Sequence, residues 1–396
     1  MAAETGRRGL MTVLPVAEHP VVGVVHDYFT QRGGAERVAE RLANLFPGST
    51  LYTSVTDPDA LPESIDPRRI QTTRLQTLRS AGMPLKAMAP ILPRAFSSID
   101  LRSHEVVISS SSAFAHHVRP LPGSVHICYC HTPPAFLWKP ATYFGEHSAT
   151  RRLAAPALAV MRRWDLEASR RVDVYAANSR FTAARIRSCY GRTAQVIYPP
   201  IETRTFLPTR ERSGRFLIVA RLRRHKSLQL AISAANRFQL PLDVVGAGTE
   251  QRRLEEAAGP TVRFLGRRDD AEVAHAMARC VALVVPGIED FGMATAEVQA
   301  AGRPPITLAE GGALEIIRDG ETGFLVAEQS ADAYGAAMLR ALREELDPNA
   351  LVDSARRFDV TVFEAAIGDL VERARARFDT SRAQSGEILA RSRSGE

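Results

Sequence analysis

The stretch from Val281 to Pro305 (VALVVPGIEDFGMATAEVQAAGRPP) constrains the fold more than any other part of this sequence. Residues 281–285 form a short, largely β-branched apolar run, which is typical of a strand buried on both faces. A Pro-Gly pair at 286–287 ends this run, residues 293–301 have the composition of a helix, and Gly302 stops that helix. A buried strand followed by a loop and a helix is the repeating unit of an open α/β sheet, in which ligands bind at the carboxyl ends of the strands.

Two acidic residues, Glu289 and Glu297, lie on the expected loop and helix of this stretch. Helical geometry over eight residues would place them about 80° apart around the axis and at most about 12 Å apart along it. That spacing suits two ends of one long ligand better than a shared metal ion, and the helix N-terminus between them offers free amides to an anion. A surface acid and an ordinary helical glutamate would be the simpler explanation. We interpret the stretch as a sugar-nucleotide site, with a carboxylate for the sugar, amides for phosphate and a carboxylate for the ribose.

The length of the chain, 396 residues, exceeds one ordinary hydrophobic core and predicts two domains. Hydrophobic residues make up 45% and charged residues 24%, as in globular proteins, and no apolar run is long enough to span a bilayer. The net charge of +7 is compatible with nucleic acid, an anionic membrane or anionic substrates. The arginines are spread out and no aromatic-interleaved binding motif accompanies them, so we expect no nucleic-acid partner.

The four cysteines, Cys128, Cys130, Cys189 and Cys280, show neither disulfide nor zinc spacing. Buried free thiols in a reducing cytoplasm account for them, so we expect a cytoplasmic protein. The Asp57-Pro-Asp59 segment superficially matches a D-x-D metal motif, but its prolines indicate a turn. We therefore expect no metal site at this segment.

Two loops of the N-terminal half stand at the carboxyl ends of expected strands. Residues 21–25 form a strand, and the Gly33-Gly34 pair follows it before a helix over residues 35–46. A glycine pair lets a backbone approach a ligand closely, although it also serves plain turns. His131 follows directly on a strand over residues 125–130 and opens the segment HTPPAFLW, whose prolines fix its backbone.

The C-terminal half carries two cations and two glycine turns at corresponding places. Arg221 and Lys226 follow an expected strand over residues 216–219, where an arginine and a lysine can clamp a diphosphate. Gly246-Ala-Gly248 begins like the dinucleotide fingerprint G-x-G-x-x-G, but Gln251 stands at its third glycine position. That departure argues against a nicotinamide or flavin dehydrogenase. Gly266 ends a further expected strand.

In combination, these motifs resemble those of the family 4 glycosyltransferases. The stretch from Val281 to Pro305 resembles the E-x7-E segment of the family, and Arg221 and Lys226 match its pattern of a strand, an arginine, four residues and a lysine. The segment YCHTPPAFLW resembles the family's histidine motif, closest to a subgroup of bacterial mannosyltransferases. The resemblance covers about residues 21–375. It implies the GT-B fold, in which two Rossmann-like, doubly wound parallel-sheet domains face each other across a cleft.

The resemblance also implies a retaining, metal-independent transfer of a hexose from a nucleotide-sugar donor, with the donor held mainly by the C-terminal domain. It carries catalytic roles onto His131, Glu289, Arg221 and Lys226. The residues that it implies at the donor are Gly33, Gly34, Arg221, Lys226, Gly246, Gly266, Glu289, Phe291, Gly292, Met293 and Glu297. Glu289 would hold sugar hydroxyls, Glu297 the ribose, Arg221 and Lys226 the diphosphate, and His131 the region of the anomeric carbon.

GDP-mannose is the expected donor, from the likeness of HTPPAFLW to the mannosyltransferase subgroup alone. This sequence departs from the subgroup at Pro134-Ala135, so a UDP- or dTDP-hexose stays open. The expected acceptor is a hydroxyl of a glycan or of a lipid-linked molecule, and no cofactor is expected. Two other classes were weighed, a sugar-nucleotide epimerase on the same fold and a non-catalytic partner subunit. The intact motif residues argue against both.

The expected organisation is a disordered leader at 1–20, an N-terminal acceptor domain at 21–205 and a C-terminal donor domain at 206–360. A helix at 361–378 would cross back to the N-terminal domain before a disordered tail at 379–396. Residues 68–102 alternate basic and apolar side chains and contain no acidic residue before Asp100. Such a segment is either an ordinary surface helix pair or a site of peripheral contact with an anionic membrane, at the inner face of the cell membrane.

Overall fold

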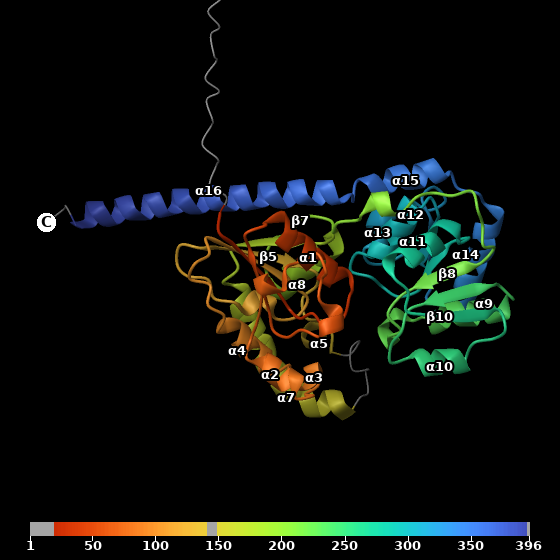
Figure 1. The fold of residues 1–396 in the computed structure, drawn as a ribbon, viewed down its shortest axis with the longest axis horizontal. Coiled ribbons are helices and arrows are strands. Elements are labelled where there is room, and N and C mark those ends of the chain that lie inside the picture. The colour runs from red at the N-terminus through yellow and green to blue at the C-terminus, as the bar shows by residue number, and fades with distance from the viewer. Residues whose placement is uncertain (1–19, 141–148, 394–396) are drawn as a thin grey trace, which may run out of the picture.

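The computed structural model describes residues 20–140 and 149–393 and contains two α/β domains that lie side by side (Figure 1). Most of the expected leader, and the final residues 394–396, lie outside the described ranges. Each domain is built on one parallel sheet, so the predicted pair of Rossmann-like domains is confirmed. No helix in the described ranges is long and apolar enough to cross a membrane.

The N-terminal sheet has seven strands in the order β3-β2-β1-β4-β5-β6-β7. The strands are β1 (Val22–His26), β2 (Thr50–Thr53), β3 (Ile70–Thr72), β4 (Val106–Ser111), β5 (Val125–Cys130), β6 (Val174–Ala177) and β7 (Gln195–Val196). Strands β1, β4 and β5 are buried along their whole length, as their apolar runs predict. The edge strand β3 was not predicted, because it is three residues long and lies in a basic segment.

The helices of this domain connect the parallel strands across both faces of the sheet. They are α1 (Gly34–Leu45), α2 (Leu75–Ser80), α3 (Leu85–Met88), α4 (Leu92–Ser97), α5 (Ala135–Trp138), α7 (Ala149–Ser169) and α8 (Arg180–Tyr190), with a 3₁₀ turn, η3, at Ala115–His117. Helices α2 to α4 lie in the basic segment 68–102. Some apolar residues of this segment are in the core and others are at the surface. Leu75, Met88 and Leu92 are buried, whereas other apolar side chains of the segment are exposed.

The C-terminal sheet has six strands in the order β10-β9-β8-β11-β12-β13. Its strands are β8 (Phe216–Val219), β9 (Leu242–Val245), β10 (Val262–Gly266), β11 (Leu283–Val285), β12 (Pro305–Leu308) and β13 (Phe324–Val326). Its helices are α9 (Gln229–Arg237), α10 (Gln251–Glu256), α11 (Asp270–Arg279), α12 (Met293–Ala300), α13 (Ala313–Ile316), α14 (Ala331–Arg343) and α15 (Pro348–Arg356). The strand order changes direction between β8 and β11, and the carboxyl ends at such a point form a ligand crevice.

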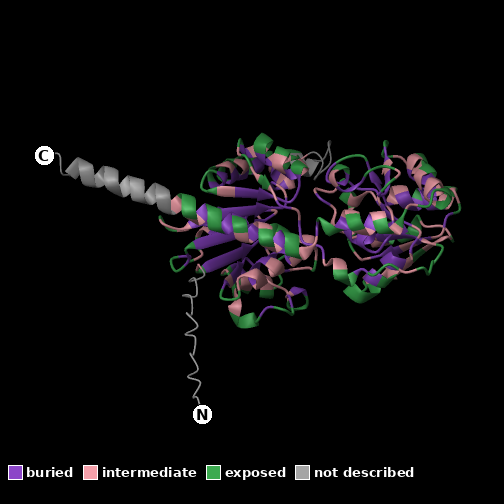
Figure 2. Ribbon diagram, turned by 90° about the horizontal axis from the view of Figure 1, so that it is seen from above, coloured by how far each residue is buried: buried purple, intermediate pink, exposed green. Residues whose placement is uncertain are grey.

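Helix α16 (Val360–Arg393) begins beside the C-terminal domain and lies across the N-terminal one (Figures 1 and 2). Phe363, Ile367, Leu370 and Val371 belong to the buried core that also contains β1, β4 and β5. The helix continues past residue 378, where the sequence analysis ended it, to Arg393. The stretch 379–393 contains no proline, which would end a helix, and its Ala, Arg, Glu, Gln and Leu residues are helix formers, so the helix can continue.

Candidate active site

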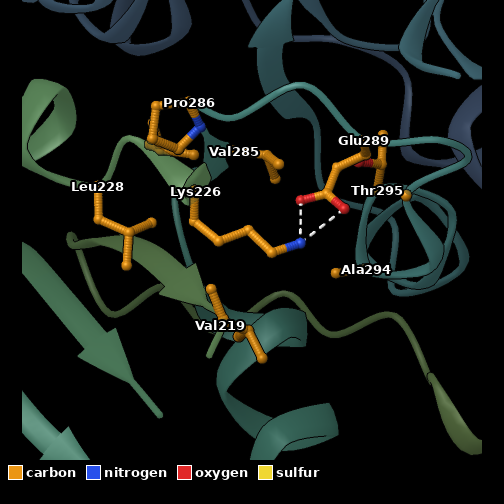
Figure 3. Close-up of a pocket in the computed structure, with 11 residues that line it drawn as sticks. Val219, Lys226, Leu228, Val285, Pro286, Glu289, Ala294 and Thr295 are labelled. Carbon is orange, nitrogen blue, oxygen red and sulfur yellow. Dashed lines mark hydrogen bonds and ion pairs between the residues drawn. The ribbon is translucent and has the colours of Figure 1, made fainter. Parts of the chain in front are cut away.

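Lys226 and Glu289 meet at the carboxyl ends of β8 and β11, where the strand order of the C-terminal sheet changes direction. The Nζ atom of Lys226 donates to both carboxylate oxygens of Glu289, at 2.6 and 2.7 Å. A pocket of about 100 Å³ opens beside the pair, with Val219, Leu228 and Pro286 among its walls (Figure 3). Both charged side chains are partly exposed, so a ligand can reach them.

Glycines shape the loop that carries Glu289 to the start of α12. Gly292 has a φ of 97°, a left-handed conformation that L side chains rarely adopt. Gly312 donates its N–H to the carbonyl of Glu289 at 2.9 Å, and a Cβ there would lie 2.4 Å from backbone atoms of Phe291. The loop is therefore held by close backbone contacts, and it presents the N-terminal amides of α12 to the pocket side.

The side chains of Phe291 and Met293, at the end of this loop, contact different parts of the protein. The side chain of Phe291 is buried against Tyr198 and Phe358, with ring centroids 5.6 and 5.2 Å away, so it supports the loop from the core and does not line the pocket. Met293 faces the N-terminal domain. A Cβ added to Gly34 would lie 2.8 Å from the Met293 sulfur, so the first βα loop and the start of α12 are in contact. The structure thus brings Gly34 together with Met293, whereas the neighbour of Gly33 is the Glu36 side chain.

Glu297 lies one to two turns along α12 and lines a different pocket from Glu289. This second pocket, of about 350 Å³, lies between α1, α11 and α12 and includes Arg37, Arg41 and Asp270. Arg37 reaches across the domains and pairs with Glu297, its Nη1 standing 2.7 Å from Oε1. The nearby carboxylate raises the pKa of the Arg37 guanidinium. Glu297, the residue predicted to bind the ribose, is thus already paired with an arginine of the other domain.

His131 stands at the end of β5, as predicted, and it is almost fully buried. Its Nε2 is hydrogen-bonded to the Ser110 hydroxyl at 2.8 Å, and its ring meets the Tyr129 ring edge-on with centroids 5.2 Å apart. Burial, with a smaller contribution from His26, lowers the pKa of His131 to about 3. The imidazole is therefore neutral at neutral pH.

Four consecutive serines, Ser109 to Ser112, hold the polar groups around His131, and the sequence analysis missed their role. Ser109 bonds the Nε2 of His126 at 2.9 Å, Ser110 bonds His26 as well as His131, and Ser111 bonds the Nδ1 of His116 at 3.1 Å. Ser112 donates its backbone N–H to Asp27 at 2.6 Å. The sequence feature that could have predicted this role is the run of four hydroxyl side chains at the end of a buried strand, where each hydroxyl needs a hydrogen-bond partner.

Two carboxylates, Asp290 and Glu315, form contacts between the domains beside the site, and neither was predicted from the sequence. Arg185 on α8 places Nη1 2.5 Å from Asp290, and the Thr132 hydroxyl donates to the same oxygen at 3.3 Å. Burial raises the pKa of Asp290, and Arg185 opposes that shift. Glu315 accepts the N–H groups of Arg180 and Phe181 at 2.8 and 3.0 Å, so a C-terminal residue caps the first turn of α8.

The remaining predicted residues lie around the carboxyl ends of β8, β9 and β10. Arg221 is exposed, and in the described ranges no carboxylate pairs with it. Gly246 packs against the loop of Arg221, because an added Cβ would lie 1.9 Å from the carbonyl oxygen of Ala220. Gly266 has a φ of 70° with open space around it. Close packing against the neighbouring loop thus requires a glycine at position 246, independently of any ligand.

Comparison with known proteins relates both domains to glycosyltransferases. Residues 32–205 match the family model of Glycosyltransferase Family 4, and residues 201–358 match that of Glycosyl transferases group 1. A phosphatidyl-myo-inositol mannosyltransferase of Mycobacterium leprae is 33% identical over 132 residues, which cover 31% of this chain and 35% of that protein. A D-inositol 3-phosphate glycosyltransferase of a Nocardioides species is 35% identical over 124 residues, or 30% of this chain and 27% of that protein.

Among solved structures, the HepE protein of Anabaena, crystallised with UDP and glucose, matches with a TM-score of 0.67. The match covers 89% of this chain and 100% of HepE at 17% identity, and it shows the shared fold. The curated relatives are matched over only about a third of their own lengths. The two family models, however, follow one another over both sheets of this structure. The chain thus has the GT-B fold, and each of its two domains matches a glycosyltransferase family model.

Proposed function

We propose that this protein is a retaining glycosyltransferase that moves a hexose from a nucleoside diphosphate to an acceptor hydroxyl. The observation that carries the proposal is the Lys226–Glu289 pair beside the N-terminus of α12, at the crevice of the C-terminal sheet. A cation, a carboxylate and free helix amides are the groups that a diphosphate and a sugar require in one place.

In this mechanism the donor replaces Glu289 as the partner of Lys226. The diphosphate binds the Lys226 ammonium, the exposed Arg221 and the amides of α12. Glu289 then binds the sugar hydroxyls. As the sugar–phosphate bond breaks, the charge that develops on the departing diphosphate is stabilised by these groups, an effect worth several kcal/mol. The transfer needs no metal ion in this scheme, and no side chain acts as a covalent nucleophile.

His131 and Glu297 serve the other parts of the donor. The neutral imidazole of His131, held by Ser110, contributes a hydrogen bond near the anomeric carbon without supplying a proton. Glu297 accepts hydrogen bonds from the ribose hydroxyls once Arg37 releases it. The acceptor oxygen attacks the anomeric carbon on the face from which the diphosphate departs, and its proton passes to the departing diphosphate oxygen, so configuration is retained.

GDP-mannose is the proposed donor. The HTPPAFLW segment and the mannosyltransferase among the relatives favour it. A UDP- or dTDP-hexose is the second candidate, and the HepE complex with UDP favours the uridine form. The proposed acceptor is a hydroxyl of a glycan or lipid-linked molecule, reached in the cytoplasm or at the inner face of the membrane.

A thermal-shift panel of GDP-mannose, GDP, UDP-glucose, UDP-N-acetylglucosamine and dTDP-sugars tests the proposal. A ligand at 100 times its Kd stabilises a protein by about 2.7 kcal/mol, which is a visible shift. A response to GDP and GDP-mannose alone supports mannose, and a uridine or thymidine response replaces it. The absence of any shift would favour a non-catalytic subunit. Conversion of the donor to its epimer without an acceptor would favour an epimerase.

A further inference from the structure

Two histidines and an aspartate converge in the N-terminal domain, apart from the donor pockets. His116 and His117 end the η3 turn that follows β4, and Asp165 lies on α7. The Oδ1 atom of Asp165 is 3.0 Å from the Nε2 of His116 and 3.5 Å from the Nε2 of His117. All three side chains are buried, with exposed fractions of 3%, 3% and 0%.

The three atoms that face one another have no hydrogen bond of acceptable geometry within the described part of the chain. The outer polar atoms of His116 and Asp165 have hydrogen-bond partners. The Nδ1 of His116 is bonded to Ser111, and the Oδ2 of Asp165 accepts from the Trp138 indole at 2.7 Å and the Tyr190 hydroxyl at 2.9 Å. Buried polar atoms without a partner are rare in proteins and call for an ion or a water molecule that satisfies them.

We propose that His116, His117 and Asp165 coordinate a divalent transition-metal ion of the zinc class, through Nε2, Nε2 and Oδ1. Two imidazoles and a carboxylate are a donor set that such ions prefer, and outer partners of the kind seen here orient metal ligands. Bonds of about 2.0–2.1 Å in a tetrahedral site put neighbouring ligand atoms about 3.3 Å apart. The separations of 3.0 and 3.5 Å fall on either side of that spacing.

The ion would have a structural role. It would fasten α7 and the Trp138 end of α5 to the turn after β4, and it would leave one coordination position for water. Ser111, which holds His116, adjoins Ser110, which holds His131, so the ion would stabilise the strand end that carries the candidate active site. The cluster shares no residue with either pocket, and the transfer reaction itself does not pass through it.

The test uses the full chain, purified and dialysed against metal-free buffer, with metal content measured by mass spectrometry. We expect about one zinc-class ion per chain. After removal of the ion, titration with Co²⁺ should give the visible d–d bands of a tetrahedral site without thiolate charge-transfer absorption. His117→Gln and Asp165→Asn should lose the bands. His104→Gln should keep them. His104 is also a buried histidine, but it precedes the start of β4, whereas the cluster follows the end of that strand.

Each other outcome contradicts the proposal. A folded wild-type chain that gives no tetrahedral Co²⁺ bands would make the cluster a hydrogen-bonded triad only. Thiolate charge-transfer bands would place the ion on cysteines, and retention of the bands by folded His117→Gln would place it elsewhere. If both ligand variants fail to fold by circular dichroism, the wild-type Co²⁺ spectrum decides the matter. None of these readouts depends on glycosyl transfer, so the result stands apart from the proposed function.

Discussion

Arg185 of the N-terminal domain and Asp290 of the C-terminal domain form an ion pair, 2.5 Å long, between the two halves of the candidate active site. Asp290 follows Glu289 directly in the chain, and Arg185 also donates to the carbonyl of Pro133, two residues after His131. One guanidinium thus ties the loop of the predicted sugar-binding carboxylate to the loop of the predicted histidine.

Replacement of Arg185 by alanine should lower kcat/KM about 10- to 100-fold, because small misplacements of positioned groups carry costs of that size. Asp290, which is only partly exposed, would also lose its cation. The measurement is steady-state transfer with the donor that the thermal-shift panel selects. Arg187→Ala on the same helix is the matched control, because Arg187 is exposed. Equal turnover by the two variants would show that the bridge does not position the site.

Lys226→Ala and Glu289→Gln should each reduce turnover by at least about 100-fold, the range for lost electrostatic stabilisation of a transition state. Both side chains are partly exposed, so the free energy of unfolding should change little. Turnover and melting temperature measured on the same samples separate the two effects. Glu328→Gln, at an exposed position of the same domain, should behave as wild type. Near-normal turnover in either site variant would remove that residue from the mechanism.

Arg37→Ala should raise the affinity for the donor several-fold, because it frees Glu297 from its present partner. Glu297→Gln should weaken donor binding, because a neutral amide is the poorer acceptor for ribose hydroxyls. Isothermal titration of the nucleoside diphosphate measures both. Arg187→Ala is the control, since Arg187 is an exposed arginine of the same domain that does not line this pocket. Weaker binding by Arg37→Ala would mean that Arg37 itself holds the donor.

Local sequence predicted the parts of the site that one strand and one loop determine. His131 follows an apolar run directly, and Lys226 and Glu289 lie in the segments just after two other runs, so their places near strand ends could be predicted from the runs alone. Gly34 could be placed in the first βα loop, but its contact with Met293 depends on how the domains meet.

The parts that the sequence did not predict arise from long-range packing. The pairs of Arg185 with Asp290 and of Arg37 with Glu297 join residues from different domains, and no periodic pattern encodes such pairs. The serines of β4 have no polar periodicity within a strand that is buried on both faces, so their partners emerge only from the fold. Phe291, expected at the donor, is a core residue because Tyr198 and Phe358 approach it from distant segments.

Mild acid should destabilise the fold. Burial lowers the pKa of His131 and of His126 to about 3 each, whereas histidines in an unfolded chain titrate near 6.5. Between these values the unfolded chain binds more protons than the folded one, so the free energy of unfolding rises with pH and reaches its full value above about pH 6.5. Each histidine contributes up to about 1.4 kcal/mol per pH unit within that window.

Urea unfolding at pH 5 and pH 7 measures this dependence. His126→Gln should flatten it, because the variant has lost one of the buried titrating groups. His275→Gln should leave it unchanged, because His275 is exposed. Carboxylates with lowered pKa add a dependence of the same sign, so the difference between variant and wild type is the informative quantity. An identical pH dependence in His126→Gln would contradict the assignment.

The chain should bind anionic membranes through the segment that holds α2, α3 and α4. Leu78, Met83 and Ile91 expose 37%, 37% and 43% of their surface, and Lys86 and Arg94 are exposed among them. These helices lie at the lower end of the N-terminal domain, on the side opposite α16 (Figure 1). Apolar side chains surrounded by cations suit the interface of an anionic bilayer.

Liposome flotation with phosphatidylglycerol vesicles tests this expectation, and vesicles of phosphatidylcholine alone should not bind, because each cation near an anionic surface contributes about 1 kcal/mol. Combined Lys86→Glu and Arg94→Glu should abolish flotation, whereas Ile91→Ser should weaken it by the loss of apolar contact. Leu342→Ser is the matched control, because Leu342 is 52% exposed on α14 of the other domain. If the wild-type protein stays at the bottom of the gradient with anionic vesicles, the segment is an ordinary helical surface, and the acceptor must reach the site without help from this face.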